Sequence, residues 1–342
     1  MNIDSKEDLS ISSPQLPLEA PSSISRRSFL NTALGAMGGA SLGWAAASTS
    51  FASGAEAAPA GTHKKDIRIG MMTAPVSQLP LDAVLTMAKR CGIAALEIMS
   101  GPGSSLIDPM SFNQADADKV KQKLADRQLE ISSLANYMDS AAPGKTEEVQ
   151  AIAKKMIDAA ALLEVPTICM ITGLPHSGTS KIAMLKQYVP TVFRPIVDHA
   201  KEKGIQVAVE NWFATCLQGL DTFDCLMETI PDENFGLNYD PSHLVHQELD
   251  IMIPVARFSK RIFHTHAKDS LIDVQRRNYV GILGGGWWRY VIPGYGNINW
   301  GEYVGNLREV GYRGVLSIEH EDNTFGPEEG FQHGARYLGR FC

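Results

Sequence analysis

Four acidic or imidazole side chains of this 342-residue chain each end or follow a short apolar run, where an ionisable group is costly unless its charge is compensated. Glu210 follows Val-Ala-Val, Asp240 follows Leu-Asn-Tyr, His266 ends Ile-Phe-His-Thr-His, and Glu319 follows Val-Leu-Ser-Ile. Taken singly, such a glutamate is more often a salt-bridge partner in a loop, and such a histidine is more often a hydrogen-bonded core residue. Taken together, three neighbouring carboxylates would repel one another and raise their pKa values, so the set predicts a shared divalent cation.

The spacing within two of these segments indicates which side chains point the same way. Side chains along a strand repeat their direction every two residues, so His264 and His266 share one face. His266 lies nearer the carboxyl end and is the better ligand, with His264 deeper as a supporting residue. Glu319 and Glu321 also share a face, and Glu319 is preferred because it directly follows the apolar run.

The types of these ligands indicate both the metal and its chemistry. An oxygen-rich site with one imidazole favours Mn²⁺, Mg²⁺ or Co²⁺ over structural Zn²⁺, with Zn²⁺ as the alternative. Such a cation suits proton transfer next to a sugar carbonyl, because it stabilises an enediolate while carboxylates move the proton. Glu210 and Glu319 belong to different segments and are expected to face opposite sides of the substrate. Removal of a proton from one side and its return on the other is epimerisation, so these two carboxylates are the predicted catalytic residues.

The elements that must position these residues form an alternation of β-rich and helical stretches after residue 66. Strands are expected at 67–73, 94–99, 129–135, 166–171, 205–211, 235–240, 261–266 and 314–320. Amphipathic helices between them include 81–91, 112–127, 147–163, 182–203 and 303–310. Helix stops are expected at Gly92, Gly204 and Gly311.

Eight such units predict an α/β fold, a single-domain (β/α)8 TIM barrel over residues 61–342, with its active site at the carboxyl ends of the strands. A doubly wound open sheet is the structural alternative, but it usually has about five or six units. In addition, no GxGxxG motif follows the first expected strand.

One connection, residues 269–299, is longer than such a barrel needs. It contains three consecutive glycines at 284–286, followed by Trp287 and Trp288. A connection of this length is usually functional, so it is predicted to form a lid or a substrate wall. Trp212 directly follows another expected strand and joins these tryptophans as a candidate platform for a sugar face, with packing under the loop as its alternative.

Residues 1–60 differ in composition from the rest of the chain. Residues 25–30 read Ser-Arg-Arg-Ser-Phe-Leu, a twin-arginine pattern, and no charged residue follows Arg27 until Glu56. Small residues then offer cleavage sites near 57–60. The pattern resembles a Tat signal, which predicts a signal peptide and linker over 1–60, the Tat export machinery as a partner, and a periplasmic or otherwise exported protein. An uncleaved membrane anchor is the alternative, although the Gly and Ser content makes insertion weak.

Composition narrows the classes of partner. Lys+Arg number 31 against 38 Asp+Glu, and the net charge of −7 predicts no nucleic-acid partner. The 5 cysteines are dispersed without a CxxC pair and indicate buried or incidental thiols rather than a disulfide framework. No Gly-rich phosphate-binding loop occurs. Because sugar phosphates are mainly intracellular, the export signal and this missing loop favour a non-phosphorylated sugar or keto-sugar as substrate.

The order and spacing of these motifs resemble the sugar phosphate isomerase/epimerase family, the xylose isomerase-like TIM barrels. The motifs that carry the resemblance are Glu210, the Asp-x-x-His at 240–243, the His-x-Lys-Asp at 266–269, the Ile-Glu-x-Glu at 318–321 and the Pro-Gly-x-Gly segment at 293–300. Together they cover the chain from about residue 67 to its end.

This resemblance assigns roles to individual residues. It implies that one divalent metal is held by Glu210, Asp240, His266 and Glu319. His243 would lie against the substrate and Glu97 would face the pocket, and His264, although deeper, is predicted with them as a substrate-binding residue. Ketose epimerases of the family carry an arginine shortly after the strand-7 histidine, and Lys268 is its stand-in here. Barrels of this family often pair, so a homo-oligomer is a further expectation.

The predicted function is therefore that of a divalent-metal-dependent sugar isomerase or epimerase acting through a metal-stabilised enediolate. A lyase is one alternative, because the same base and metal could expel the β-substituent of a 3-keto glycoside. A non-catalytic periplasmic sugar-binding barrel is another, but it would need no clustered carboxylates. The related apurinic endonuclease barrel is disfavoured, because Glu97 and Asn136 stand where its additional metal-binding histidines would be needed.

Overall fold

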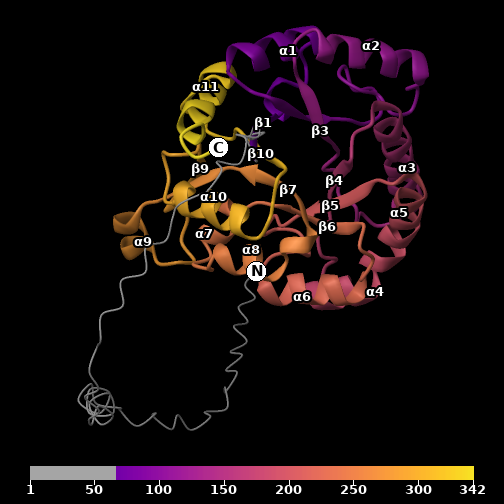
Figure 1. Ribbon diagram of the computed structural model, residues 1–342. Helices are drawn as coiled ribbons and strands as arrows, with labels where there is room; N and C mark the ends of the chain where they lie inside the picture. The colour runs from indigo at the N-terminus through magenta and orange to yellow at the C-terminus, as the bar shows by residue number, and fades with distance from the viewer. Residues whose placement is uncertain (1–66) are drawn as a thin grey trace, which may run out of the picture. The chain divides into compact units, whose positions relative to one another are not determined.

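The computed structural model describes residues 67–342, and these residues form the predicted barrel. Eight parallel strands close in the order β1-β10-β7-β6-β5-β4-β3-β2 (Figure 1). They are β1 (Arg68–Met72), β2 (Ala95–Met99), β3 (Glu130–Ala135), β4 (Thr167–Ile171), β5 (Gln206–Glu210), β6 (Phe235–Tyr239), β7 (Ile262–Ala267) and β10 (Val315–Ile318). Each coincides with one of the strands expected from the sequence, with ends that differ by at most two residues.

Helices follow these strands along the chain, and the longer ones lie around the outside of the barrel (Figure 1). They are α1 (Leu81–Arg90), α2 (Gln114–Ala125), α3 (Thr146–Leu163), α4 (Lys181–Gln187), α5 (Val189–Lys203), α6 (Leu220–Thr229), α7 (Ser242–Val245), α8 (Met252–Arg257), α9 (Val274–Val280), α10 (Trp300–Glu309) and α11 (Pro327–Leu338). Two short 3₁₀ helices, η1 (Ala74–Val76) and η2 (Ser259–Arg261), complete the set.

Helix ends follow the glycine positions for a simple steric reason. Gly204 caps α5 with φ 70°, a left-handed conformation that costs least without a Cβ atom. One expected helix, 182–203, is wrong in detail, because it divides into α4 and α5. Pro190 lies at the start of α5, has no N–H to donate and cannot continue a preceding helix.

The barrel is held together by apolar side chains on both faces of its strands. All five residues of β4 and of β6 are buried, as expected for parallel strands covered by helices. Helix α3 turns Val149, Met156 and Ile157 inward with essentially no exposure. Burying a side chain of this size stabilises the fold by about 1.5–3 kcal/mol.

The connection between β7 and α10 is a folded excursion rather than an irregular loop. It contains the antiparallel pair β8 (Asp269–Ile272) and β9 (Trp288–Val291), with α9 between them. Asp269 fixes the return segment, which is the chain that leads from β9 back to α10. Its carboxylate accepts hydrogen bonds from Trp300 Nε1 at 2.8 Å and from the backbone N–H groups of Gly294 and Ile298 at 3.1 and 3.0 Å. This arrangement explains the Pro-Gly-x-Gly segment, because a Cβ on Gly296 would lie 2.3 Å from Asp269 Oδ1.

The five cysteines are free thiols, and four of them are buried. Within residues 67–342, no helix is long and apolar enough to cross a bilayer. The predicted twin-arginine signal over residues 1–60 lies outside the described part of the chain.

Candidate metal centre and substrate pocket

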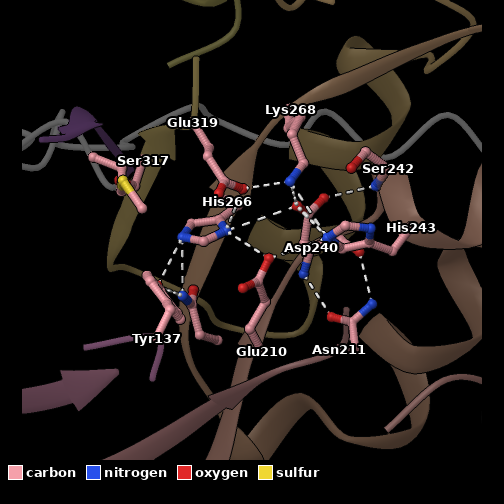
Figure 2. Close-up of polar contacts among 12 residues, drawn as sticks. Tyr137, Glu210, Asn211, Asp240, Ser242, His243, His266, Lys268, Ser317 and Glu319 are labelled. Carbon is pink, nitrogen blue, oxygen red and sulfur yellow. Dashed lines mark hydrogen bonds and ion pairs between the residues drawn. The ribbon is translucent and has the colours of Figure 1, made fainter. Parts of the chain in front are cut away.

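The four predicted ligands meet at the carboxyl ends of four neighbouring strands. Glu210 is the last residue of β5, Asp240 directly follows β6, His266 lies in β7, and Glu319 directly follows β10. One ligand atom from each lies within 4.8 Å of the others, and all four residues are buried (Figure 2). The strand register therefore brings together residues that are 109 positions apart at the extremes of the sequence, from 210 to 319.

Two atoms of this cluster face it without a hydrogen bond. Nδ1 of His266 lies 3.0 Å from Glu319 Oε2 and 3.4 Å from Glu210 Oε1, yet no hydrogen bond within the described structure satisfies it. Oδ2 of Asp240 lies 3.7 Å from the same nitrogen and is also unsatisfied and buried. Both atoms have charged neighbours, because Nδ1 faces the Glu319 carboxylate and Asp240 Oδ2 lies 3.2 Å from Lys268 Nζ, but neither has a hydrogen bond. Buried polar atoms are normally hydrogen-bonded, so the pair fits a metal ion that both would ligate.

The backbone around Asp240 is fixed so that this oxygen points into the cluster. The side-chain amide of Asn211 donates to Asp240 O at 2.8 Å, and its carbonyl accepts from Asp240 N at 2.8 Å. Oδ1 of Asp240 accepts from the N–H of Ser242 at 2.8 Å, which leaves Oδ2 for the cluster (Figure 2).

The other ring nitrogen of His266 faces a buried glutamate. Nε2 lies 3.0 Å from Glu97 Oε2, and the same carboxylate accepts bonds from the hydroxyls of Tyr137 at 2.5 Å and Ser317 at 2.9 Å. A carboxylate in this position fixes the proton on Nε2 and leaves Nδ1 as a ligand. Burial alone would raise the pKa of Glu97, but charge on His266 and His264 and these hydrogen bonds hold it at about 2.

The structure corrects the expected places of Glu97 and His264. Glu97 lies behind His266, fully buried, and does not line the substrate pocket. His264 lies two residues earlier in β7 and bonds Ser132 Oγ and Asn238 Oδ1 at 3.0 and 2.9 Å. It lines a cavity at the amino ends of the strands instead, because a two-residue step keeps the face but moves about 6–7 Å along the strand.

Lys268 and His243 are at the pocket, as the sequence predicts. Lys268 Nζ lies 2.6 Å from Glu319 Oε2 and 3.2 Å from Asp240 Oδ2 (Figure 2). Burial alone would lower its pKa, but the surrounding carboxylates hold it well above its ordinary value. His243 Nε2 lies 3.1 Å from Glu210 Oε1, so it contacts the predicted base directly.

The pocket above this cluster has a volume of about 500 Å³. Its polar lining residues include Glu210, Glu319 and Glu321. Its aromatic lining residues are Trp212, Phe213, Trp288, Tyr290 and Tyr137. A lining with both kinds of side chain suits a sugar, whose ring has an apolar face and hydroxyls at its edge.

The excursion between β7 and α10 supplies part of this wall, as the sequence predicts. In β9, Trp288 and Tyr290 point into the pocket, and Trp288 stacks on His246 with ring centroids 3.9 Å apart. Trp287 does not line the pocket, because alternation along the strand turns it away, where Arg277 lies over its ring. Tyr290 donates through its hydroxyl to His243 Nδ1 at 2.6 Å, if His243 Nε2–H faces Glu210.

Several pocket residues were missed by the sequence reasoning. Tyr290 was detectable, because it lies two residues after Trp288 and shares its face in any strand. Tyr137 follows β3 as Glu210 ends β5, so its place at a strand end was also a usable signal. Phe213 and the role of Asn211 depend on loop geometry after β5, and no periodic pattern in the sequence indicates them.

Comparisons with known proteins agree with this architecture. The uncharacterized protein YfiH of Bacillus subtilis is 26% identical over 304 residues, which cover 78% of this chain and 96% of that protein. The inosose dehydratase of Geobacillus thermodenitrificans is 28% identical over 153 residues, 42% of this chain and 51% of that protein. This second match thus spans about half the length of the relative.

Two solved structures share the fold at low sequence identity. The zinc-bound IolI protein has a TM-score of 0.64 and 18% identity, covering 81% of this chain and 99% of its own. An L-ribulose 3-epimerase has a TM-score of 0.60 and 16% identity, covering 80% of this chain and 94% of its own. The sequence itself matches the family of xylose isomerase-like TIM barrels over residues 85–341. With its closed barrel and its strand-end cluster, the chain belongs to the xylose isomerase-like TIM barrel family.

Proposed function

We propose that this protein is a divalent-metal-dependent enzyme that moves a proton at the carbon next to a carbonyl of a sugar or keto-sugar. The observation that carries the proposal is the buried group Glu210, Asp240, His266 and Glu319, whose ligand atoms lie within 4.8 Å of one another. A divalent ion, when bound there, supplies a Lewis acid for the carbonyl. The zinc in the IolI structure supports a metal in this fold, while the single imidazole favours Mn²⁺, Mg²⁺ or Co²⁺.

The positions of the two glutamates around the barrel support the proposal that they act from different sides of a substrate. Glu210 on β5 and Glu319 after β10 are separated around the barrel by β6 and β7, and both line the pocket. Lys268 holds the Glu319 carboxylate at 2.6 Å, and His243 contacts the Glu210 carboxylate at 3.1 Å. One carboxylate can therefore remove a proton while the other returns it, which gives epimerisation or isomerisation.

Elimination is the second candidate, because inosose dehydratases are among the relatives and their reaction class removes water. The first step would be the same proton removal by Glu210 or Glu319. The reactions diverge afterwards, according to whether the proton returns to carbon or a β-substituent leaves. The products alone distinguish them.

The charge of the pocket supports a non-phosphorylated substrate. Among the described residues that line the pocket, Lys268 is the only lysine or arginine, and its Nζ already lies among the carboxylates of Glu319, Asp240 and Glu321. A phosphate dianion would meet three glutamates and no free guanidinium. We therefore propose a free sugar, keto-sugar or keto-glycoside as the substrate.

We also propose that residues 1–60 direct export through the Tat machinery, supported by the Arg26-Arg27 pattern. Replacing both arginines by lysine in the full chain should move the protein from the periplasmic to the cytoplasmic fraction. An unchanged distribution would contradict this part of the proposal.

Proton exchange with solvent tests the proposed chemistry directly. The metal-loaded protein in D₂O is expected to introduce deuterium next to the carbonyl of at least one ketose, inosose or 3-keto glycoside, as NMR would show. Glu319→Gln should slow the exchange by about 10²-fold or more, because it removes a proton-transfer group. Glu309→Gln, at an exposed position on α10, should leave it unchanged. Deuterium exchange with phosphorylated ketoses alone would contradict the proposed substrate class. No exchange with any of these compounds would contradict the proposed enzymatic activity.

A further inference from the structure

A second cavity lies beside the catalytic pocket, between the loops that follow β1 and β2. It has a volume of about 470 Å³, similar to the 500 Å³ of the catalytic pocket. Its wall is the segment 100–105, which reads Ser-Gly-Pro-Gly-Ser-Ser, and it is completed by Ser77, Gln78 and Asn136. Both volumes lie within the range of about 300–1,000 Å³ that is usual for ligand pockets.

The two cavities are neighbours rather than separate features. Met99, the last residue of β2, lines both of them. Asn136 lines the side cavity, and the next residue, Tyr137, lines the catalytic pocket. The two cavities therefore lie on either side of Met99, and a molecule whose reacting carbon lies above the candidate metal cluster would have to cross this side chain to reach the side cavity.

The chemistry of the side cavity is neutral and polar. Within residues 67–342, no charged side chain lines it, whereas the catalytic pocket carries three glutamates and a lysine. Ser105 and Ser77 donate their hydroxyl protons to the carbonyls of Ser77 and Ala74 at 2.6 and 2.9 Å, which leaves their oxygens free to accept. The exposed amide of Gln78 adds a donor and an acceptor. This set suits hydroxyl groups, while an anionic group would lack a counter-charge.

The wall of the side cavity is held in place by its own hydrogen bonds. Ser104 donates to Met99 O at 3.1 Å, and Asp108 accepts from Gly103 N at 3.0 Å. Ser100 and Ile107 form an isolated β-bridge across the segment. Gly101 allows a close approach, because a Cβ there would lie 2.6 Å from Asn136 Nδ2. The cavity is thus preformed, which lowers the entropy lost when a ligand binds.

We propose that the side cavity lined by Ser77, Gln78 and residues 100–105 is a second sugar subsite, so that the substrate is a keto-glycoside whose second ring binds there. This inference rests on the proposed function and narrows its substrate class from keto-sugars in general to two-ring keto-glycosides. A monosaccharide would fill only the catalytic pocket.

Binding of two matched ligands to the metal-loaded full chain tests the subsite without requiring turnover. By calorimetry, a 3-keto disaccharide is expected to bind at least about tenfold more tightly than the methyl 3-keto glycoside of its reacting ring, in proportion to the added contacts. Gln78→Trp, which would fill the side cavity from an exposed position, should remove this difference and leave binding of the methyl glycoside unchanged. Gln122→Trp, also exposed but on α2, is the control and should retain the difference.

Equal affinities for the two ligands, or a preference that persists in Gln78→Trp, would overturn the subsite. Absence of binding by both ligands would overturn it as well. Failure of the proposed chemistry gives a different result. Tight, Gln78-dependent binding without deuterium exchange would support the subsite and contradict the proposed enzymatic activity.

Discussion

His266 joins two different environments through its two ring nitrogens. Nδ1 faces the carboxylates of Glu210 and Glu319, while Nε2 lies 3.0 Å from the buried carboxylate of Glu97. Glu97 in turn accepts bonds from Tyr137 and Ser317. The ring therefore has one nitrogen fixed as a donor and the other directed at the metal cluster.

This arrangement predicts that Glu97 affects metal binding without touching the metal. Glu97→Gln should lower the affinity for Mn²⁺ by about 10–100-fold, because an amide is a weaker acceptor for Nε2–H and orients the ring less firmly. Titration calorimetry measures the change, with Glu309→Gln as control and circular dichroism to confirm folding. An affinity equal to that of the wild type would show that Glu97 does not position His266.

Metal binding should also release a proton from His266. Burial alone would lower the pKa of His266, but the charges of Glu319 and Glu97 hold it well above its ordinary value. Below that raised pKa the metal-free ring is protonated, so a metal must displace a proton from Nδ1.

The apparent affinity for Mn²⁺ should therefore fall by up to about tenfold for each unit of decrease in pH around neutrality. Calorimetry in buffers of different ionisation enthalpy should report release of about one proton per metal ion. Binding that is independent of both pH and buffer would contradict a role of His266 as ligand.

The sequence indicated the four clustered side chains, but it did not indicate how deep in the barrel Glu97 and His264 lie. Glu210, Asp240 and Glu319 directly end or follow strands and His266 is the next-to-last residue of β7, so their convergence was predictable from strand period and barrel topology. Glu97 lies in the middle of the apolar strand β2, and its place behind His266 depends on three-dimensional packing that a single strand does not reveal.

Among the elements, the β8–β9 ribbon connects the barrel to the aromatic wall of the pocket. It carries Trp288 and Tyr290 inward, and its return segment is fixed by Asp269. The sequence predicted a substrate wall in this connection from its length and its tryptophans. It did not predict the paired strands, because the three glycines at 284–286 interrupt any alternation between them.

Because Gly296 lies close to Asp269, a larger residue at position 296 should destabilise this ribbon. In Gly296→Ala, the new Cβ would lie 2.3 Å from Asp269 Oδ1 and 2.7 Å from Ser270 O, so the free energy of unfolding should fall by about 1–3 kcal/mol. Chemical denaturation measures the change. Gly305→Ala is the matched control, because its Cβ meets nothing within 4 Å in helix α10, and it should stabilise the protein by up to about 1 kcal/mol. A loss in both variants, or in neither, would contradict this assignment.

For the whole molecule, eight strand–helix units were predictable because the apolar runs and helix-ending glycines repeat along the chain. The break between α4 and α5 was the main local error, and Pro190 explains it. Closure of the barrel then brings β5, β6, β7 and β10 side by side, so the cluster of four candidate metal ligands follows from the topology. The side cavity depends on two loops, whose conformations the sequence does not specify.

The metal content of the purified protein shows whether this barrel holds one divalent ion at its strand ends. Elemental analysis of protein purified without chelators and then reloaded with Mn²⁺, Co²⁺ or Zn²⁺ should give about one equivalent per chain. Glu319→Gln should reduce this content, because it removes a ligand, whereas Glu309→Gln should retain it. Metal absent from the reloaded wild type, or undiminished in Glu319→Gln, would contradict the site and leave a sugar-binding barrel as the remaining interpretation.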